Sequence, residues 1–228
     1  MRSLLELGHL ESLESAAQSF ASCIEARKFF DPEAFAMWCR RILVDHPSKQ
    51  ALILPPGTVV EGDLFLDGDA GLSLDGEPDD PALASVATIL ALGSLTIHGS
   101  VINVSTDDGD FLLVGGDLHT HAVIKGAASI VVLGTLTSQS AIFCDYCAGA
   151  LVTGGDVTAP LVISNDHDLT IGGTLNGVLI SSELGNMRAS LVADVFADPN
   201  DPDDEWPDGA LVRAQIDAGL PLLRTGAA

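Results

Sequence analysis

Positive charge is scarce in this chain. Of its 228 residues, 10 are Lys or Arg and 32 are Asp or Glu, which gives a formal net charge of −22. Between residues 51 and 187 the imbalance is sharper, since 17 acidic residues stand against one basic residue, Lys125. A surface of this sign repels the phosphates of nucleic acids and anionic lipid headgroups. We therefore expect neither direct nucleic-acid binding nor membrane binding.

Aromatic residues, cysteines and long apolar runs are also few. Aromatics make up 5% of the chain, and four cysteines are few for this length, which is the usual pattern of reduced thiols in the cytosol. No run approaches the roughly 18 apolar residues that a membrane span needs. Glu6, Glu11 and Glu14 interrupt any signal-like segment at the start. These absences predict a cytoplasmic protein.

A short glycine motif recurs in the middle of the chain. Hydrophobic residues make up 47% of the sequence and the mean hydropathy is +0.35, so a large core is expected. Within this apolar background a glycine, a small polar residue and then Leu or Val occur together at irregular intervals of 18 to 31 residues. The copies are Gly62-Asp63-Leu64, Gly93-Ser94-Leu95, Gly116-Asp117-Leu118, Gly134-Thr135-Leu136, Gly155-Asp156-Val157 and Gly173-Thr174-Leu175.

This repeat predicts a single-stranded parallel β-helix, that is, a β-solenoid. Apolar residues alternate at period two on both sides of most of the glycines, which is a strand signal, and a glycine at a fixed phase permits a tight corner. Intervals in this range are typical of solenoids. Coils stacked about 4.8 Å apart would align the motif's apolar residues in one interior column. The column would contain Leu64, Leu95, Leu118, Leu136, Val157 and Leu175.

Two acidic turns interrupt the repeat. Glu77 to Pro81 contains Asp79 and Asp80 between two prolines, so it is expected to leave the solenoid wall as a loop. A second turn, from Thr106 to Asp110, has the composition of a hairpin or corner and is expected to project in the same way. Its carboxylates are Asp107, Asp108 and Asp110.

The two ends differ from the repeat and predict caps. Residues 1–50 show helical spacing at Leu10, Leu13, Ala17 and Phe20, and Asp31-Pro32-Glu33 is a helix start signal, so we expect an N-terminal helical cap. Residues 51–187 form the predicted solenoid. Residues 188–228 contain an acidic, proline-rich loop and then a short capping helix with Val212 and Ile216 one turn apart. Caps at both ends would prevent end-to-end polymerisation.

Metal-binding and catalytic patterns are weak. His119 and His121 lie on one side of a predicted strand, and Cys144 and Cys147 have the spacing of a metal knuckle, but the two pairs occupy different phases of the repeat. Ordinary packed or surface residues are the favoured interpretation, and we expect no cofactor.

A carboxylate pair, Asp67 and Asp69, has the spacing that a polysaccharide-cleaving β-helix could use for acid and base catalysis. With one Tyr and two Trp in the chain, however, there is little aromatic platform for a sugar. No nucleophilic triad or phosphate-binding loop stands out. We expect a protein that is not an enzyme.

Trp206 has the properties of a contact residue. It follows a run of carboxylates that includes Asp201, Asp203, Asp204 and Glu205, on a segment with many prolines. An aromatic residue in such a setting is typical of an anchor at a protein interface. The equally weighted alternative is that the indole folds back over the C-terminal helix.

The repeat resembles two known groups. In its loosest form, as in Leu90-Ala91-Leu92-Gly93-Ser94-Leu95, it is similar to the repeat of the polymer-forming bactofilin-like solenoids. It also resembles a group of bacterial immunity proteins of polymorphic toxin systems, in which such a solenoid is followed by an acidic stretch and a short helix. The second resemblance covers more of the chain, from about Leu52 to Leu223.

The resemblance to immunity proteins implies binding and neutralisation of a cognate toxin in the cytoplasm. Such toxins are often basic because many act on nucleic acids or nucleotides, so an acidic surface would speed association. The alternative is a bactofilin-like structural protein that assembles through its coils. The expected contact residues are Asp79, Asp80, Asp107, Asp108, Asp110, Asp201, Asp203, Asp204, Glu205 and Trp206.

Overall fold

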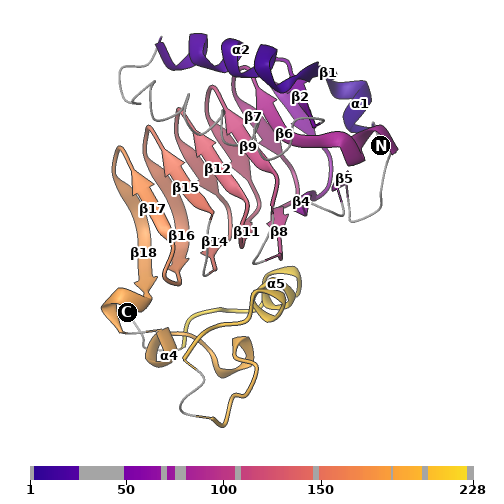
Figure 1. The fold of residues 1–228 in the computed structure, drawn as a ribbon. Coiled ribbons are helices and arrows are strands. Elements are labelled where there is room, and N and C mark those ends of the chain that lie inside the picture. Colours follow the sequence, from indigo (N-terminus) through magenta and orange to yellow (C-terminus); the bar gives the residue numbers. More distant parts are fainter. Residues whose placement is uncertain are drawn as a thin grey trace.

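The structure, a computed structural model, is a mainly β protein built on a parallel β-solenoid, as the sequence predicts (Figure 1). It describes residues 3–25, 49–67, 71–74, 81–105, 109–145, 149–185, 187–201 and 205–224. Each coil contributes strands to three walls, and the coils are joined by parallel pairing within each wall. The predicted solenoid boundary at residue 51 is close to the first strand of the walls, which starts at Gln50.

The walls follow one another along each coil. Wall 1 contains β2 (Gln50–Leu54), β6 (Val86–Ala91), β9 (Phe111–Val114), β12 (Ser129–Val132), β15 (Ala150–Thr153) and β17 (Asp168–Ile171). Wall 2 contains β3 (Thr58–Val60), β7 (Leu95–Ile97), β10 (Leu118–Thr120), β13 (Leu136–Ser138) and the first parts of β16 (Val157–Ser164) and β18 (Leu175–Ser181). Wall 3 contains β4 (Leu64–Asp67), β8 (Val101–Asn103), β11 (Val123–Lys125), β14 (Ala141–Cys144) and the remaining parts of β16 and β18.

The predicted interior column is confirmed from its second member onward. Leu95 pairs with Leu118, and the register continues through Leu136 and Val157 to Leu175. The prediction for Leu64 is wrong, because Leu64 pairs with Val101 on wall 3. Thr58 holds the first place of the column instead.

Gly62 has the sequence of the motif, but it belongs to a different corner of the solenoid. It lies between walls 2 and 3, where its carbonyl accepts a hydrogen bond from the N–H of Gly99 (3.1 Å). In the first coil the place equivalent to Gly93 is held by Pro56, whose side chain lies against that glycine. Because the first copy of the motif has a proline where the later copies have a glycine, a search for glycine does not find it.

The corner glycines serve close packing of one coil on the next. The N–H of Gly134 donates to the carbonyl of Gly116 (2.8 Å), and Gly155 donates to Gly134 in the same way. A Cβ atom on Gly134 would lie 2.6 Å from the Gly116 oxygen, well inside van der Waals contact. These glycines are not among the described residues with positive φ, so contact distance, and not left-handed backbone, requires them.

The small polar residue of the motif also has a structural role. The Asp117 Oδ1 atom accepts a hydrogen bond from the N–H of Thr135 in the next coil (2.8 Å), and Asp156 accepts from Thr174 (2.7 Å). Ser94 Oγ accepts from Asp117 N–H in the same way (3.1 Å). The polar residues of the motif therefore form a ladder of side-chain-to-backbone hydrogen bonds along one corner of the solenoid.

The N-terminal segment closes the first coil. It consists of α1 (Leu4–Leu7), β1 (His9–Ser12) and α2 (Leu13–Glu25). β1 pairs antiparallel with β2, and α2 packs Leu13 and Phe20 against the outer face of wall 1. The helical spacing at Leu10 was misleading, because that residue lies in β1, while the start signal at Asp31 lies outside the described residues.

Wall 3 is closed at the same end by a hairpin. β5 (Gly71–Leu74) pairs antiparallel with β4, the first strand of this wall. A 3₁₀ helix, Pro81–Ser85, then leads into β6. Antiparallel neighbours therefore cover the first edges of two of the three walls, which protects their backbone groups.

The C-terminal segment, called here the C-terminal lobe, comprises residues 187–201 and 205–224. It follows the 3₁₀ helix Ser182–Leu184 and contains α4 (Met187–Ser190), the 3₁₀ helix Ala193–Val195 and α5 (Gly209–Asp217). The predicted helix is confirmed as α5, with Val212 and Ile216 buried. The side chain of Asp208 caps its first turn.

This lobe covers the outer face of wall 3. Outward side chains of successive coils form an apolar row there, and α5 contacts β11 and β14 (Figure 1). α5 thus lies beside the strands and not over the last coil. The row, read from the strand registers, is Phe65, Ile102, Ile124, Phe143, Ile163 and Ile180.

The last coil is the most exposed part of the solenoid. Val178 and Leu179 of β18 are 41% and 36% exposed, and the interior-facing Leu169, Ile171 and Leu175 are only partly buried. Within the described residues, β17 and β18 have a strand neighbour on one side only.

Among the helices of the described residues, none is long and apolar enough to cross a membrane.

Candidate binding cleft

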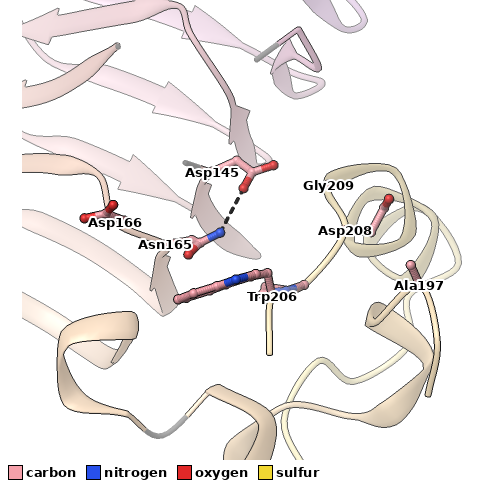
Figure 2. Close-up of a pocket in the computed structure, with 8 residues that line it drawn as sticks. Asp145, Asn165, Asp166, Ala197, Trp206, Asp208 and Gly209 are labelled. Atoms are coloured by element: carbon pink, nitrogen blue, oxygen red, sulfur yellow. Dashed lines mark hydrogen bonds between the residues drawn. The ribbon is translucent and has the colours of Figure 1, made fainter. Parts of the chain in front are cut away.

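A cleft opens where wall 3 meets the C-terminal lobe. It has a volume of about 460 Å³. One side is made by residues that follow strands of wall 3, and the other by the lobe segment that leads into α5 (Figure 2). Its lining residues are Asp145, Asn165, Asp166, Ala197, Trp206, Pro207, Asp208 and Gly209.

Coil stacking places the first pair of polar residues. Asp145 and Asn165 each come directly after a wall 3 strand, β14 and β16, in neighbouring coils. The N–H of Asn165 donates to the Cys144 carbonyl (2.9 Å), and its side-chain amide donates to Asp145 Oδ1 (3.1 Å). Asn165 is 3% exposed, so the carboxylate is held by a buried amide.

Asp166 projects because of its backbone conformation. It has φ 45°, in the left-handed region that Asp tolerates better than most residues. Its N–H donates to the Ser182 hydroxyl (2.8 Å), which fixes this turn to the next coil. The side chain is left exposed at the rim of the cleft.

Trp206 lies on the opposite side of the cleft. Backbone contacts on its C-terminal side fix its position: Pro207 forms an isolated β-bridge with Phe196, and Asp208 N–H donates to the Val195 carbonyl (2.8 Å). The indole nevertheless remains 49% exposed. Figure 2 shows it nearly edge-on, with Asp145, Asn165 and Asp166 on the same side of the ring. The alternative that the indole folds back over the C-terminal helix is not what the structure shows.

Asp208 contributes a carboxylate whose position is fixed. Its Oδ1 atom accepts hydrogen bonds from the N–H groups of Ala210 (2.8 Å) and Leu211 (3.0 Å) at the start of α5. The cleft is thus bordered by three carboxylates, those of Asp145, Asp166 and Asp208.

A polar pair, buried Lys125 and partly buried His167, lies beside the cleft. Lys125 Nζ donates to the Gly126 carbonyl (2.9 Å) and to His167 Nε2 (2.6 Å), while His167 Nδ1 donates to the Asp145 carbonyl (2.8 Å). Burial, with the nearby Lys125 charge as a second cause, lowers the pKa of His167 to about 4. His167 is therefore neutral at pH 7, with its proton on Nδ1. Lys125 also lines a smaller neighbouring cavity of about 200 Å³.

The arginines of the lobe are bonded to the lobe itself or to the first coil. Arg188 donates to the carbonyls of Asp198 (3.3 Å) and Pro199 (2.9 Å), and its guanidinium lies 4.7 Å from the centre of the Phe196 ring. Arg224 donates to the Leu191 carbonyl (2.6 Å). Arg213 bonds to carboxylates of the first coil and of α5. None of the three lines the cleft.

The structure brings only some of the sequence-predicted contact residues to this region. Asp201, Glu205 and Trp206 are exposed on the lobe, and Trp206 lines the cleft. Asp110 must be removed from the predicted contact surface, because it is 4% exposed at the start of β9, where coil packing buries it. The remaining predicted contacts lie outside the described residues: Asp79, Asp80, Asp107, Asp108, Asp203 and Asp204.

His119 and Cys144, two residues of the metal hypothesis, lie on separate walls. His119 is exposed on β10 of wall 2, whereas Cys144 is fully buried on β14 of wall 3. Burial raises the pKa of the Cys144 thiol to about 11, so it stays protonated. Among the described residues there is no cluster of three or more His, Cys, Asp or Glu that could hold a metal ion. Cys147 lies outside that part of the chain.

The structure describes only one residue of the carboxylate pair that was considered for catalysis. Asp67 ends β4 at the β4–β5 hairpin, and Asp69 lies outside the described residues.

The sequence analysis does not predict Asp145, Asn165 and Asp166, the polar residues on one side of the Trp206 ring, as contact residues. Asp145 lies between Cys144 and Cys147, and Asn165 and Asp166 belong to none of the sequence motifs described above. A signal was available, since Asp145 and Asn165 are polar residues at the same position of neighbouring coils. It could be seen only once the strand register was known.

Comparison with protein-family models, with curated proteins and with solved structures finds no match for this chain.

Proposed function

We propose that this protein is a cytoplasmic immunity protein that binds and neutralises a basic bacterial toxin. One observation carries the proposal. Lys125 is the single Lys or Arg between residues 51 and 187, and it is 1% exposed. The solenoid surface therefore presents carboxylates and neutral groups with no exposed Lys or Arg of its own, which favours encounter with a positively charged partner.

The distribution of carboxylates supports contact with the partner through one part of the surface. The outward row of wall 2 contains Val59, Thr96, His119, Thr137, Thr158 and Asn176, and no carboxylate. Several carboxylates of the motif instead accept backbone hydrogen bonds at the corners. Contact through the lobe and its cleft is therefore favoured over contact through the flat face of wall 2.

Neutralisation in cells tests the proposal directly. The genes next to this one are searched for a toxin domain, which is expressed with and without the chain, and survival is compared. Rescue by the chain, together with an association rate that falls as salt is raised from low to physiological concentration, is the expected result. Absence of a toxin gene from the neighbourhood, or rescue without complex formation, would contradict the proposal.

A second candidate function is assembly into a structural polymer, and the exposed last coil favours it. Within the part of the chain that the structure describes, the outer edges of β17 and β18 have no strand neighbour, and together with exposed Val178 and Leu179 they could pair with another copy. The first coil is covered on walls 1 and 3 by β1 and β5, however, which favours pairs over long filaments. Light scattering after size-exclusion chromatography distinguishes the two functions, because polymers grow with concentration and a monomer or closed dimer does not.

A further inference from the structure

We infer that the cleft at Trp206 binds the side chain of an arginine from the partner protein. This inference rests on the proposed function in one respect, that the partner is basic, and it names the group of the partner that the cleft receives. It requires an aromatic face that is accessible, carboxylates that line the same cleft, and a net negative charge among the described groups around it.

The accessible face is that of Trp206. Half of the side chain is exposed, although the neighbouring backbone is fixed by hydrogen bonds and a β-bridge to the Val195–Phe196 segment. A rigid, exposed indole beside a cavity is a preferred surface for a cation, and arginine is the side chain found most often in such contacts. Exposure of this ring is costly in water, so covering it stabilises a complex.

The carboxylates stand on the same side of the ring. Asp145 and Asp166 come from the solenoid, and Figure 2 shows both above the plane of the indole with the buried Asn165 between them. A guanidinium stacked on the ring would direct its N–H groups sideways toward these oxygens. An ammonium group has no planar face to stack, so lysine fits this arrangement less well.

The same combination of groups is already used within the molecule. The Arg213 guanidinium lies 5.0 Å from the centre of the Phe65 ring and donates to Asp63 (3.1 Å). Phe65 and Asp63 belong to the first coil, and Trp206 with Asp145 and Asp166 presents an equivalent aromatic face and carboxylates near the last coils. The difference is that the latter set surrounds an open volume of about 460 Å³.

Competing cations do not reach the cleft from the described residues. Arg188, Arg213 and Arg224 are bonded elsewhere in the lobe or to the first coil. Lys125 is buried and donates to Gly126 and His167, and the smaller cavity that it lines shares Asp145 and Asp208 with the cleft. The cleft has three carboxylates for the one ammonium group of Lys125, so its electrostatic potential stays negative.

Nuclear magnetic resonance titration of the full chain tests the inference without knowledge of the toxin. The probe is a blocked tripeptide, acetyl-Gly-Arg-Gly-amide, and its control is the same peptide with citrulline, which has nearly the same shape and no charge. We expect saturable shifts of the Trp206 indole signal and the Asn165 side-chain amide with arginine. Citrulline should bind about tenfold more weakly.

Variants then locate the binding. Trp206→Leu should abolish the saturable shifts at Asn165, and Asp145→Asn, which keeps the acceptor for Asn165, should weaken binding several-fold. Asp194→Asn is the matched control, because it removes one carboxylate charge from an exposed position of the lobe outside the cleft. Equal shifts with both peptides, no shift with either, or equal weakening by Asp194→Asn and Asp145→Asn would overturn the inference.

Toxin neutralisation separates this inference from the proposed function. If the wild-type chain and the Trp206→Leu variant neutralise the toxin equally, the arginine cleft is refuted and the proposed function stands. If arginine binds but no toxin is neutralised, the proposed function fails and the cleft remains a site for a guanidinium. Circular dichroism of each variant confirms that the fold is retained.

Discussion

Arg213 and Asp63 are 150 positions apart in sequence, and their side chains form an ion pair of 3.1 Å. Arg213 lies on α5 and Asp63 at a corner of the first coil, so this pair connects the C-terminal lobe to the opposite end of the solenoid from the one where the lobe begins. Asp63 also accepts a hydrogen bond from the Ser100 N–H (2.8 Å) through its other oxygen. The lobe is thereby held along the whole length of wall 3.

A double-mutant cycle measures this connection. Arg213→Gln, Asp63→Asn and the double variant should show a coupling free energy of unfolding of about 0.5–1.5 kcal/mol, because both side chains are partly shielded from water. Asn at position 63 keeps the acceptor for Ser100, so the cycle reports on the ion pair. Urea unfolding at low and high salt gives the values. Strictly additive effects of the two substitutions would show that the pair contributes nothing.

Gly134→Ala should destabilise the solenoid by about 1–3 kcal/mol. The added methyl group would collide with the Gly116 backbone and with the Asp117 carboxylate, and two adjacent coils would have to separate locally. Thr135→Ala, one position along, is the control, because it removes side-chain atoms from the same corner without adding any. Thermal unfolding compares the two. Similar midpoints for both variants would show that the corner tolerates a Cβ atom.

The acceptor after each corner glycine should matter more than its charge. Asp117→Ala removes the acceptor for the Thr135 N–H and is expected to cost about 1–2 kcal/mol of unfolding free energy. Asp117→Asn retains an oxygen at that position and should cost less. Chemical denaturation of both variants checks the order. A larger loss for Asn than for Ala would indicate that the negative charge, and not the hydrogen bond, is what the corner requires.

His167 should make stability depend on pH between about 6.5 and 4. Its folded pKa is lowered from 6.5 to about 4, so the unfolded chain binds more protons across this window. Stability is fully present above pH 6.5 and is lost progressively as pH falls toward 4. His167→Gln offers an uncharged acceptor for Lys125 and cannot take up the proton.

The measurement for His167 is the difference in unfolding free energy between wild type and His167→Gln as a function of pH. Carboxylate titrations common to both chains cancel in this difference. We expect the wild type to lose stability relative to the variant as pH falls through this window. A pH-independent difference would mean that His167 keeps its ordinary pKa in the folded chain.

The sequence by itself determined the repeat and therefore the fold class. A strand requires alternating apolar residues, and a corner where two backbones touch requires a glycine such as Gly134. Both requirements are local, so the sequence of a single coil is enough to show them. The short helix at residues 209–217 was equally local, because Asp208 caps it and Val212 and Ile216 lie one turn apart. Charge composition determined the sign of the surface.

Only the tertiary structure decided which coil each corner belongs to and where the lobe packs. Gly62 has the motif but stacks on Gly99, and Pro56 lacks it but stacks on Gly93, because register depends on contacts between coils. In the same way, Asp145 and Asn165 meet Trp206 through coil stacking and through the return of the chain across wall 3. Interactions across this many residues leave no local pattern, so the cleft could not be read from the sequence.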